Sequence, residues 1–475
     1  MHCSPRSDCR RGGSHPIRVK QRYIALLADK GAVFLDGEVS GTPGMVAERK
    51  GVIYLAGDRE AVNKIEPVIG AFADHICRAR RTPARGPPGI ACFEIGRRLS
   101  RHPVGKLRTW IMHSFVYTGL PSKVLFGFGT LDKVADEVRL LDCRRALVLS
   151  TPQQEVQAND LAGRLGQVCV GTFTEAAMHT PVAITEQALA VVRERQADCT
   201  VALGGGSTTG LGKAIALRTD LPQIVVPTTY AGSEATPILG ETERGRKTTQ
   251  RTLKVLPEVI VYDVNLTLTL PSALSVTSGM NAIAHAVEAL YSPDANPVIS
   301  LLAVEGIAAL ARALPAIVSQ PADRDARSDA LYGAWACGVC LGSVGMSLHH
   351  KLCHVLGGTF DLPHAETHTI VLPHAVAYNE SAASQSMGRV AEVLASTSAA
   401  EGLFDLARRL NAPVALKDIG MPPDGVERAA DLAVASPYPN PRPVEREGIR
   451  ALLDDAFHGR RPRRAGSSIL ERAHA

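Results

Sequence analysis

Short segments that are apolar along their whole length alternate with helical patterns from about residue 112 onward. Five of these segments have the length of strands: Leu125–Gly129, Ala146–Ser150, Thr200–Leu203, Ile224–Val226 and Val259–Tyr262. Strands that carry apolar residues on both faces are typical of a parallel sheet covered by helices on both sides. The pattern therefore predicts an α/β domain over residues 112–270.

Helical periodicity replaces the strand pattern after Pro271. Long stretches rich in alanine and leucine follow, including Ser278–Tyr291, Val298–Leu314 and Arg327–Leu348. Because we find no convincing buried strand beyond this point, residues 271–475 are predicted to form an all-helical domain. A ligand is expected in the cleft between two such domains.

The first 111 residues differ from the rest of the chain. Segments rich in arginine and cysteine flank one patterned island. In it we expect strands at Ala32–Asp36 and Val52–Ala56 and an amphipathic helix at Asp58–Phe72. A fragment with half a sheet cannot bury its faces by itself. Residues 1–111 are therefore interpreted as an N-terminal extension without a catalytic role.

Two motifs in this island, Phe34–Gly41 and Tyr54–Asp58, carry a resemblance of their own. The stretch of residues 32–80 resembles the end of the nucleotide-binding domain of β-hydroxyacid dehydrogenases. Neither a GxGxxG turn before it nor a catalytic helical domain after it is present in the sequence. The resemblance therefore implies a fragment and not a working dinucleotide site.

Charge and cysteine usage limit the classes of function. The net charge of +5 arises from arginines concentrated near the two ends, and no interleaved aromatic residues accompany them, so nucleic-acid binding is not expected. The 10 cysteines are scattered like reduced thiols of a cytosolic protein. Cys337 and Cys340 form a CxxC in an apolar stretch, where core packing is expected. With no signal peptide and no apolar run near bilayer length, we expect a cytoplasmic protein with no membrane contact.

A glycine turn follows the strand Thr200–Leu203, with the sequence Gly204-Gly205-Gly206-Ser207 before a helix. Glycines let backbone amides approach phosphate oxygens, and the helix N-terminus adds partial positive charge. Alone the turn is a weak signal, because many glycine turns bind nothing. The next strand is followed by Pro227–Glu234, the segment PTTYAGSE. Since both loops leave the same end of the sheet, they are predicted to face one ligand.

Several histidines recur along the helical region: His285, His350, His354 and His364, with His349 and His368 close by. His350 and His354 are four residues apart and so share a helix face. The glycine pair at 357–358 and Pro363 bring the chain round to His364. One histidine in a helix is more often a satisfied polar residue than a ligand, but several that converge indicate a catalytic or metal site.

The GGGS turn followed by PTT and GSE resembles the iron-containing alcohol dehydrogenase superfamily, over residues 112–462. The resemblance implies a dehydroquinate synthase-like fold and a nicotinamide dinucleotide whose pyrophosphate lies on the glycine turn. The positions that it implies for cofactor binding are Gly205, Gly206, Ser207, Thr228, Thr229, Lys247 and Leu266. Ser150 stands where a carboxylate would bind the adenosine ribose. NADH is therefore expected, and NADPH is not excluded.

In the metal-dependent members of the superfamily, one aspartate and three histidines bind a divalent ion. By the resemblance, Asn281 stands at the aspartate position, and His285, His350 and His364 stand at the histidine positions. His354 is then the histidine beside the nicotinamide. An amide binds Fe²⁺ or Zn²⁺ far less readily than a carboxylate does, so no metal is expected.

Asn281, the shortened loop with Tyr230, and the phrases His350–His354 and Pro363–His368 resemble the maleylacetate reductase branch of the superfamily. The resemblance implies a homodimer that reduces the carbon–carbon double bond of maleylacetate, or of a substituted maleylacetate, to 3-oxoadipate. In that reaction His354 is expected to donate a proton, while the other three histidines polarise the substrate.

Three alternatives stay open. A metal-dependent alcohol or polyol dehydrogenase is one, since three histidines and a water can hold zinc. A lyase related to dehydroquinate synthase is the second, although its Lys- and Glu-rich site is not found in the sequence. A non-catalytic assembly protein is the third, and intact nucleotide loops with four aligned histidines disfavour it.

Overall fold

The computed structural model describes residues 36–40, 52–56, 75–79 and 114–462. The chain divides into two compact units, residues 1–111 and 112–475, and each unit is described by itself.

The first unit contains a three-stranded sheet in the order β1 (Asp36–Ser40), β2 (Val52–Ala56) and β3 (His75–Ala79). Strand β2 has the predicted bounds. Of the expected strand Ala32–Asp36, only Asp36 lies within the described residues, where it begins β1, which pairs antiparallel with β2. Strand β3, parallel to β2, was not predicted. The predicted helix Asp58–Phe72 lies outside the described residues.

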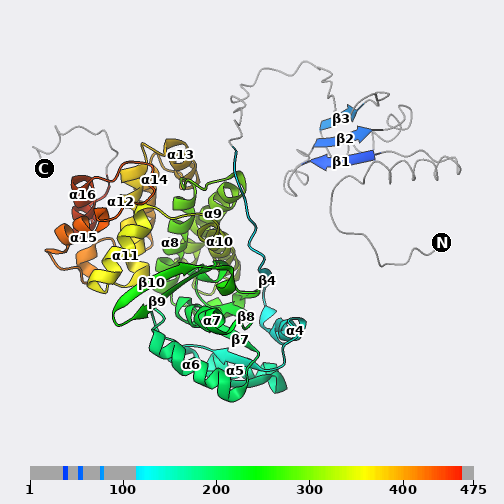
Figure 1. The fold of residues 1–475 in the computed structure, drawn as a ribbon. Coiled ribbons are helices and arrows are strands. Elements are labelled where there is room, and N and C mark those ends of the chain that lie inside the picture. Colours follow the sequence, from blue (N-terminus) through cyan, green and yellow to red (C-terminus); the bar gives the residue numbers. More distant parts are fainter. Residues whose placement is uncertain (1–35, 41–51, 57–74, 80–113, 463–475) are drawn as a thin grey trace, which may run out of the picture. The chain divides into compact units, whose positions relative to one another are not determined.

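A six-stranded parallel sheet forms the base of the second unit (Figure 1). Its strands are β4 (Lys123–Gly127), β5 (Ala146–Leu149), β6 (Cys169–Phe173), β7 (Cys199–Gly204), β8 (Gln223–Pro227) and β11 (Val259–Asp263). Their order across the sheet is β4-β11-β8-β7-β5-β6. The five predicted strands are all present. The edge strand β6 was missed because it is only partly buried and lacks a continuous apolar run.

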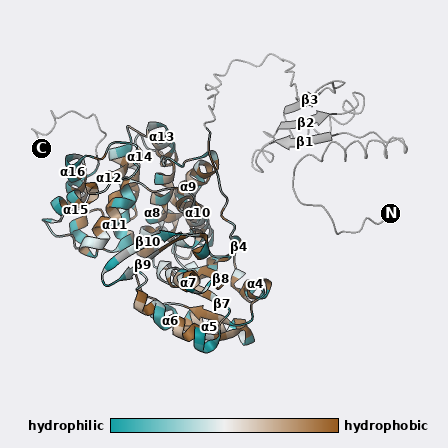
Figure 2. Cartoon of the chain, in the orientation of Figure 1, coloured by the Kyte–Doolittle hydropathy of each residue, from teal (hydrophilic) through white to brown (hydrophobic). Residues whose placement is uncertain are grey.

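Helices cover both faces of this sheet: α4 (Val134–Leu140), α5 (Glu155–Leu165), α6 (Val182–Arg195) and α7 (Gly206–Thr219). Residues that alternate along each strand pack on opposite faces of the sheet and so belong to two different apolar layers. Val148 and Val201 pack with α4 and α5, whereas Leu147, Leu149 and Ala202 pack with α6 and α7. Figure 2 shows the apolar colouring of the strands between helices of mixed character. The observed architecture confirms the predicted α/β fold class.

An antiparallel hairpin interrupts the alternation between β8 and β11. It consists of β9 (Ile238–Glu243) and β10 (Arg246–Arg251), which form a separate two-stranded sheet. Thr242 donates its amide to the carbonyl of Thr180 at 3.2 Å, and Arg218 pairs with Glu241 at 2.8 Å. The hairpin was not predicted, because polar, charged β10 lacks an apolar strand pattern.

The chain after Pro271 is helical, as predicted: α8 (Ser272–Ala289), α9 (Pro297–Ser319), α10 (Arg324–Ser343), α11 (Leu348–Phe360), α12 (His364–Asn379), α13 (Ser384–Val393), α14 (Ala399–Arg409), α15 (Gly425–Val434) and α16 (Arg446–His458). The expected helix Arg327–Leu348 is not continuous in the structure. Val344 is extended, and the chain turns by 94° between α10 and α11. The carboxylate of Glu288 accepts hydrogen bonds from the backbone amides of Ser347 and His349 and so caps the N-terminus of α11.

Helix α9, with 23 residues, is long and apolar enough to cross a membrane, contrary to the expectation that no such run exists. One face of α9 is buried in the helical core, where Ile299, Ala303, Ile307 and Leu310 pack. Cys337 and Cys340 of α10 lie in the same apolar cluster. Helix α9 thus packs as a core helix. A core helix can be as long and as apolar as a helix that crosses a membrane.

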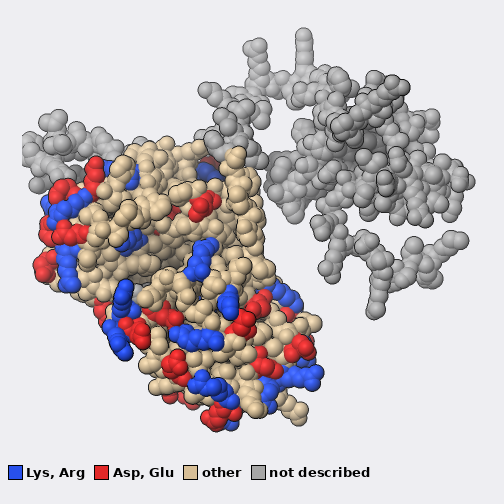
Figure 3. All heavy atoms as spheres, viewed as in Figure 1, with Lys and Arg blue, Asp and Glu red and all other residues tan. Residues whose placement is uncertain are grey.

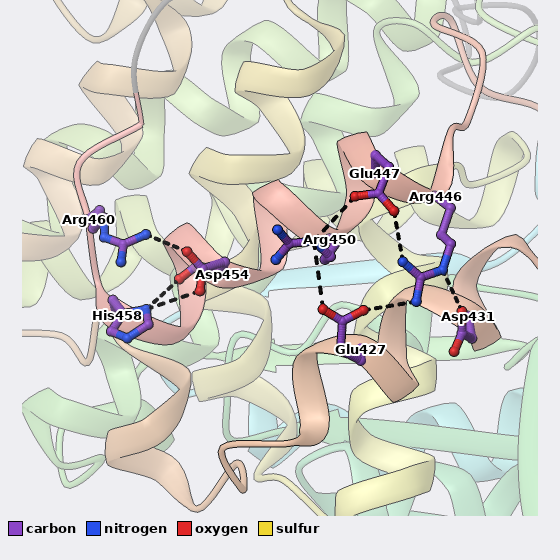
Figure 4. Close-up of polar contacts among 8 residues, drawn as sticks. All are labelled: Glu427, Asp431, Arg446, Glu447, Arg450, Asp454, His458 and Arg460. Carbon is purple, nitrogen blue, oxygen red and sulfur yellow. Dashed lines mark hydrogen bonds and ion pairs between the residues drawn. The ribbon is translucent and has the colours of Figure 1, made fainter. Parts of the chain in front are cut away.

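Basic residues near the C-terminal end of the described chain are engaged in local ion pairs. Arg446 bridges Glu427 and Asp431, and Arg460 contacts Asp454 (Figure 4). These pairs are exposed to solvent, so each contributes little to stability. Figure 3 shows acidic and basic side chains interspersed over the α/β region. The arginine-rich C-terminal helix is thus a mixed-charge surface and not a basic patch.

Candidate active site

The glycine turn joins β7 to α7 at the carboxyl end of the parallel sheet. Gly204 ends β7 with φ of 154°, and Gly205 precedes the first helical residue, Gly206. The amides of the first helical turn have no partner within the helix and carry its positive end. A Cβ atom on Gly205 would stand 3.0 Å from Cγ2 of Thr229. The turn therefore has the backbone arrangement that an anion-binding site needs, and it lies in close contact with the next loop.

Strands β7 and β8 are neighbours, which brings their loops together. Gly204 lies opposite Pro227 in the sheet, and the amide of Thr228 donates to the carbonyl of Gly204 at 3.1 Å. Gln154, from the loop after β5, donates to Oγ1 of Thr228 at 2.9 Å. The structure therefore places Gly205, Thr228 and Thr229 at one sheet edge.

Leu266 and Lys247, which are also expected to bind the cofactor, lie in different parts of the fold. Leu266 lies in a 3-10 turn, Val264–Thr267, directly after β11 and hence at the carboxyl edge of the sheet. Lys247 lies in β10, paired with Thr242 in the separate hairpin. The backbone thus places Leu266 at the carboxyl edge of the sheet and Lys247 outside the six-stranded sheet.

A buried lysine, which sequence reasoning missed, holds the loop after β8. Lys213 of α7 donates from Nζ to the carbonyls of Ser233, Thr236 and Ile238 at 2.6, 2.7 and 2.9 Å. Burial lowers the pKa of Lys213 to about 7, although the nearby Glu234 carboxylate opposes this shift. Because this side chain contacts three residues of one segment, it fixes the segment to the helix that the glycine turn begins.

The same loop contacts the histidine helix α8. The amide of Tyr230 donates to Oγ of Ser278 at 3.0 Å, and the carbonyl of Ala231 lies 3.3 Å from Nε2 of His285. Tyr230 is fully buried, and Arg327 donates to its hydroxyl at 3.3 Å. The cofactor loop and the histidines therefore form one connected structure.

Three helices that pack side by side, α8, α11 and α12, carry the histidines (Figure 1). The ring centroids of His285 and His350 are 5.0 Å apart, and those of His350 and His354 are 6.4 Å apart. His364, at the start of α12, reaches the cluster through His368, whose ring lies 4.3 Å from that of His364 and 5.1 Å from that of His350. All four predicted histidines are therefore brought together.

The cluster has a buried and an exposed side. His285, His349, His350 and His368 are buried, whereas His354 and His364 are exposed. Burial, followed by the charges of neighbouring histidines, lowers the pKa of His285, His349 and His368 well below the ordinary value. These three rings are consequently neutral near pH 7.

Glu288 is a buried carboxylate that sequence reasoning missed. It contacts Nδ1 of His350 through Oε2 at 2.7 Å, and the opposite ring atom of His350, Nε2, lies 2.9 Å from Nδ1 of His285. Glu288 is seven residues after Asn281 and three after His285, so all three share one face of α8. That spacing was the signal available in the sequence.

His349 and His368 form a second histidine pair next to the pair of His285 and His350. Nε2 of His349 lies 2.9 Å from Nδ1 of His368, and Sγ of Cys353 lies 3.7 Å from the same atom of His349. These three residues place one ligand-type atom each within 4.8 Å of one another. Burial raises the pKa of the Cys353 thiol, so the sulfur stays protonated.

Asn281 stands beside His285 on α8 with 4% of its surface exposed. Its amide oxygen, Oδ1, has no hydrogen-bond partner among the residues that the structure describes. A buried amide oxygen of this kind is available to a donor on a bound ligand.

Buried neutral histidines make the stability of the fold depend on pH. Burial lowers the pKa of His374 on α12 to about 4, although Asp455 opposes the shift. Between that value and the unfolded value of about 6.5, the unfolded chain binds more protons than the native chain, so stability rises with pH. The contribution of His374 to the free energy of unfolding, about 3 kcal/mol, is fully present above pH ~6.5 and is lost as the pH falls toward 4.

Urea unfolding at a series of pH values between 5 and 7.5 measures this dependence. We expect His374→Gln to flatten the slope, whereas the exposed His458→Gln on α16 leaves it unchanged. A free energy of unfolding that is constant with pH in the unsubstituted protein would contradict the buried, neutral state of these rings.

The glycine turn, the loop after β8 and the histidine cluster define a dinucleotide-dependent oxidoreductase. Two family models match the chain: iron-containing alcohol dehydrogenase over residues 121–264, and the C-terminal part of the Fe-containing alcohol dehydrogenase family over residues 275–457. The chain belongs to the iron-containing alcohol dehydrogenase family. It is therefore an oxidoreductase, and the family together with the glycine turn supports a nicotinamide cofactor.

Among its relatives are maleylacetate reductases. The enzyme of Rhizobium sp. (strain MTP-10005) is 57% identical over 351 residues, which are 74% of this chain and 100% of the relative. The enzyme of Burkholderia cepacia is 55% identical over 351 residues, with the same coverage. The solved structure of maleylacetate reductase from Agrobacterium tumefaciens is 57% identical, with a TM-score of 0.72 over 74% of this chain and 100% of that one.

Proposed function

We propose that this protein reduces the carbon–carbon double bond of maleylacetate, or of a substituted maleylacetate, to give 3-oxoadipate, with NADH as hydride donor. The observation that carries the proposal is Asn281, which puts a neutral amide beside a cluster of histidines in a chain 57% identical to maleylacetate reductases. Ser150 leaves NADPH open as a second donor.

The chain's own residues would act on a conjugated keto acid as follows. Gly205, Gly206 and Ser207 bind the pyrophosphate at the start of α7, and the threonines at 228 and 229 contact the cofactor from the next loop. The nicotinamide, when bound, supplies a hydride. Lys247 and Leu266 are proposed to flank its riboside. The reacting centre lies toward the histidines, because the loop residue Ala231 contacts His285.

Hydride addition to the alkene carbon β to the ketone leaves an enolate that needs stabilisation and a proton. We assign the proton to His354, which is exposed and can be reloaded from water. The other three histidines, His285, His350 and His364, are proposed to polarise the substrate, and a protonated one would also pair with a substrate carboxylate.

The donor set does not fit a strongly held divalent ion. The carboxylate ligand of the metal-dependent members is replaced by Asn281, a neutral amide. No step of the proposed reaction passes through a metal.

One contact favours the alternative, a metal-dependent alcohol or polyol dehydrogenase. Glu288 holds Nδ1 of His350 at 2.7 Å, and carboxylates hold zinc-binding histidines in this way. NADH oxidation with maleylacetate, compared with simple aldehydes and ketones, separates the two functions. A preference of at least about 100-fold for maleylacetate in kcat/KM is expected, since the site lacks a strong Lewis acid.

Activity should survive the removal of metal. After exhaustive dialysis against a strong chelator, we expect kcat with maleylacetate to stay within about twofold of its initial value, because enolate stabilisation needs only hydrogen-bond donors. Metal content is measured on the same sample. Loss of activity that only Zn²⁺, Fe²⁺ or Mn²⁺ restores would show that Asn281 is a metal ligand and that the metal-free reaction is wrong.

We also propose that residues 1–111 are an extension without a catalytic role, that 112–270 bind the dinucleotide and that 271–475 carry the substrate site. Both family models match within residues 121–457, and the Rhizobium relative is matched along its whole length by 351 residues of this chain, which supports this division. A protein that starts at Met112 is expected to keep kcat and both KM values within about twofold. Loss of most activity, or of soluble expression, would contradict this assignment.

The remaining proposals concern the setting of the enzyme. We propose a cytoplasmic homodimer that binds neither nucleic acid nor membrane. The mixed charge around α15 and α16 argues against a nucleic-acid surface, and the core packing of α9 argues against a membrane span.

A further inference from the structure

Ser233, in the loop after β8, carries a hydroxyl to which the proposed function gives no role. Its Oγ atom is buried and has no hydrogen-bond partner among the residues that the structure describes. A Cβ atom on Gly206, the first residue of α7, would stand 3.8 Å from this oxygen. The hydroxyl of Ser233 therefore faces the start of the helix on which the pyrophosphate is proposed to lie.

The backbone on both sides of Ser233 is held in place. Gly232 has a φ of 78°, and a Cβ atom on it would stand 3.0 Å from Cα of Gly338 on α10. Glu234 is buried and accepts a hydrogen bond from the hydroxyl of Tyr262 on β11 at 2.9 Å. Contacts with α10 and β11 thus fix the direction in which the Ser233 side chain leaves the loop.

Lys213 holds the carbonyl group of Ser233 itself. Its Nζ atom donates to this oxygen at 2.6 Å and to the carbonyls of Thr236 and Ile238 at 2.7 and 2.9 Å. Lys213 is 1% exposed and belongs to α7, the helix that begins at Gly206. One buried side chain therefore ties the loop to the same helix whose first residue the Ser233 hydroxyl faces.

An anionic oxygen is the acceptor that suits this hydroxyl. The first amides of α7 have no partners within the helix and carry its partial positive charge, so an anion is favoured there. A hydroxyl can donate to such an anion, and a hydrogen bond to a charged acceptor is stronger than one between neutral groups. A buried hydroxyl that has no protein partner is available for this bond.

We propose that Ser233 is a further cofactor-binding residue, whose hydroxyl donates a hydrogen bond to the diphosphate of the dinucleotide, and that Lys213 is the positioning residue that holds Ser233 there. The inference rests on the proposed function for the identity of the cofactor and deepens the description of its binding site. Lys213 acts through the backbone of the loop and not by contact with the cofactor, since carbonyl groups engage its Nζ atom.

The first test is Ser233→Ala, with binding measured by fluorescence titration of NADH and by calorimetry of ADP-ribose. The Kd for NADH is expected to rise by about 20-fold, the loss of one hydrogen bond to a charged group. ADP-ribose, which has the diphosphate but no nicotinamide, should lose the same factor. An unchanged Kd for NADH would overturn the proposal. A loss confined to NADH would place Ser233 beside the nicotinamide and would also overturn it.

Thr200→Val is the matched control. Thr200 also carries a buried hydroxyl without a partner among the described residues, but it lies at the start of β7, at the opposite end of the strand from the glycine turn. Its substitution is expected to leave both Kd values unchanged. If Thr200→Val weakened binding as much as Ser233→Ala, the loss would reflect any missing buried hydroxyl and would contradict the role of Ser233.

The second test asks whether Lys213 acts through Ser233. Lys213→Met removes the donors and is expected to raise the Kd for NADH by about 20-fold or more. Adding Ser233→Ala to this variant should cost less than about threefold more, because the hydroxyl is already displaced. Factors that simply multiply would show that Lys213 supports the fold alone. Lys254→Met, at an exposed lysine in the turn Leu253–Val255, is the control and should leave the Kd unchanged.

If Lys213→Met fails to fold, the same cycle is measured with Lys213→Gln, which keeps N–H donors on a shorter side chain. Comparison of binding with turnover separates this inference from the proposed function. NADH binding that depends on Ser233, without oxidation of NADH by maleylacetate, would overturn the proposed substrate and leave the inference standing. Turnover of maleylacetate with a Kd for NADH that Ser233→Ala does not change would overturn the inference alone.

Discussion

Replacing Gly205 by valine is expected to raise the KM for NADH by about 100-fold or more, while the KM for maleylacetate changes by less than about threefold. The Cβ atom would stand 3.0 Å from Cγ2 of Thr229, and the valine methyl groups would occupy the space where a pyrophosphate meets the backbone. A 100-fold change corresponds to about 2.7 kcal/mol of lost binding. Steady-state kinetics with each substrate varied in turn measure it.

Gly163→Val is the matched control for this substitution. Gly163 lies in α5 with open space around it, so valine there meets no neighbouring atom. It is expected to leave both KM values unchanged and, because valine is a slightly better helix former than glycine, to change the free energy of unfolding by about 0.5 kcal/mol or less. If Gly205→Val bound NADH as well as the unsubstituted protein, the glycine turn would be a turn and not a phosphate site.

Replacing His354 by alanine is expected to lower kcat by about 1,000-fold and to change the KM for maleylacetate by less than about threefold. The magnitude is that of a lost general acid. His354 is exposed and lies one helical turn from the buried His350, with ring centroids 6.4 Å apart. A residue that acts only in the transition state affects kcat and kcat/KM equally. Single-turnover measurement of NADH oxidation separates this step from product release.

Alanine at the other three positions should have a different signature. His285→Ala, His350→Ala and His364→Ala are expected to lower kcat and also to raise the KM for maleylacetate, because these rings would contact its polar groups. His458→Ala, an exposed substitution on α16, should change neither constant and serves as the matched control. A kcat for His354→Ala within tenfold of the unsubstituted value would move the proton donor to another histidine.

Packing decided several features that local sequence patterns do not encode. The hairpin β9–β10 consists largely of polar residues, so its strands carry no hydrophobic alternation to reveal them. The break between α10 and α11 depends on Glu288, which accepts amides 59 and 61 residues away in the chain. A helix boundary set by so distant a side chain cannot be read from the local sequence.

The sequence by itself determined the parallel sheet, the glycine turn after β7 and the residues available for chemistry, because buried strands, glycine turns and histidine spacing are local patterns. Only the tertiary structure decided how these residues act on one another. The packing of α8 and α11 against α12 brings Glu288, His350 and His285 into one hydrogen-bonded line. The hydrogen bonds of that line, about 3 Å long, join residues more than 60 positions apart in the chain, and such proximity arises from packing alone.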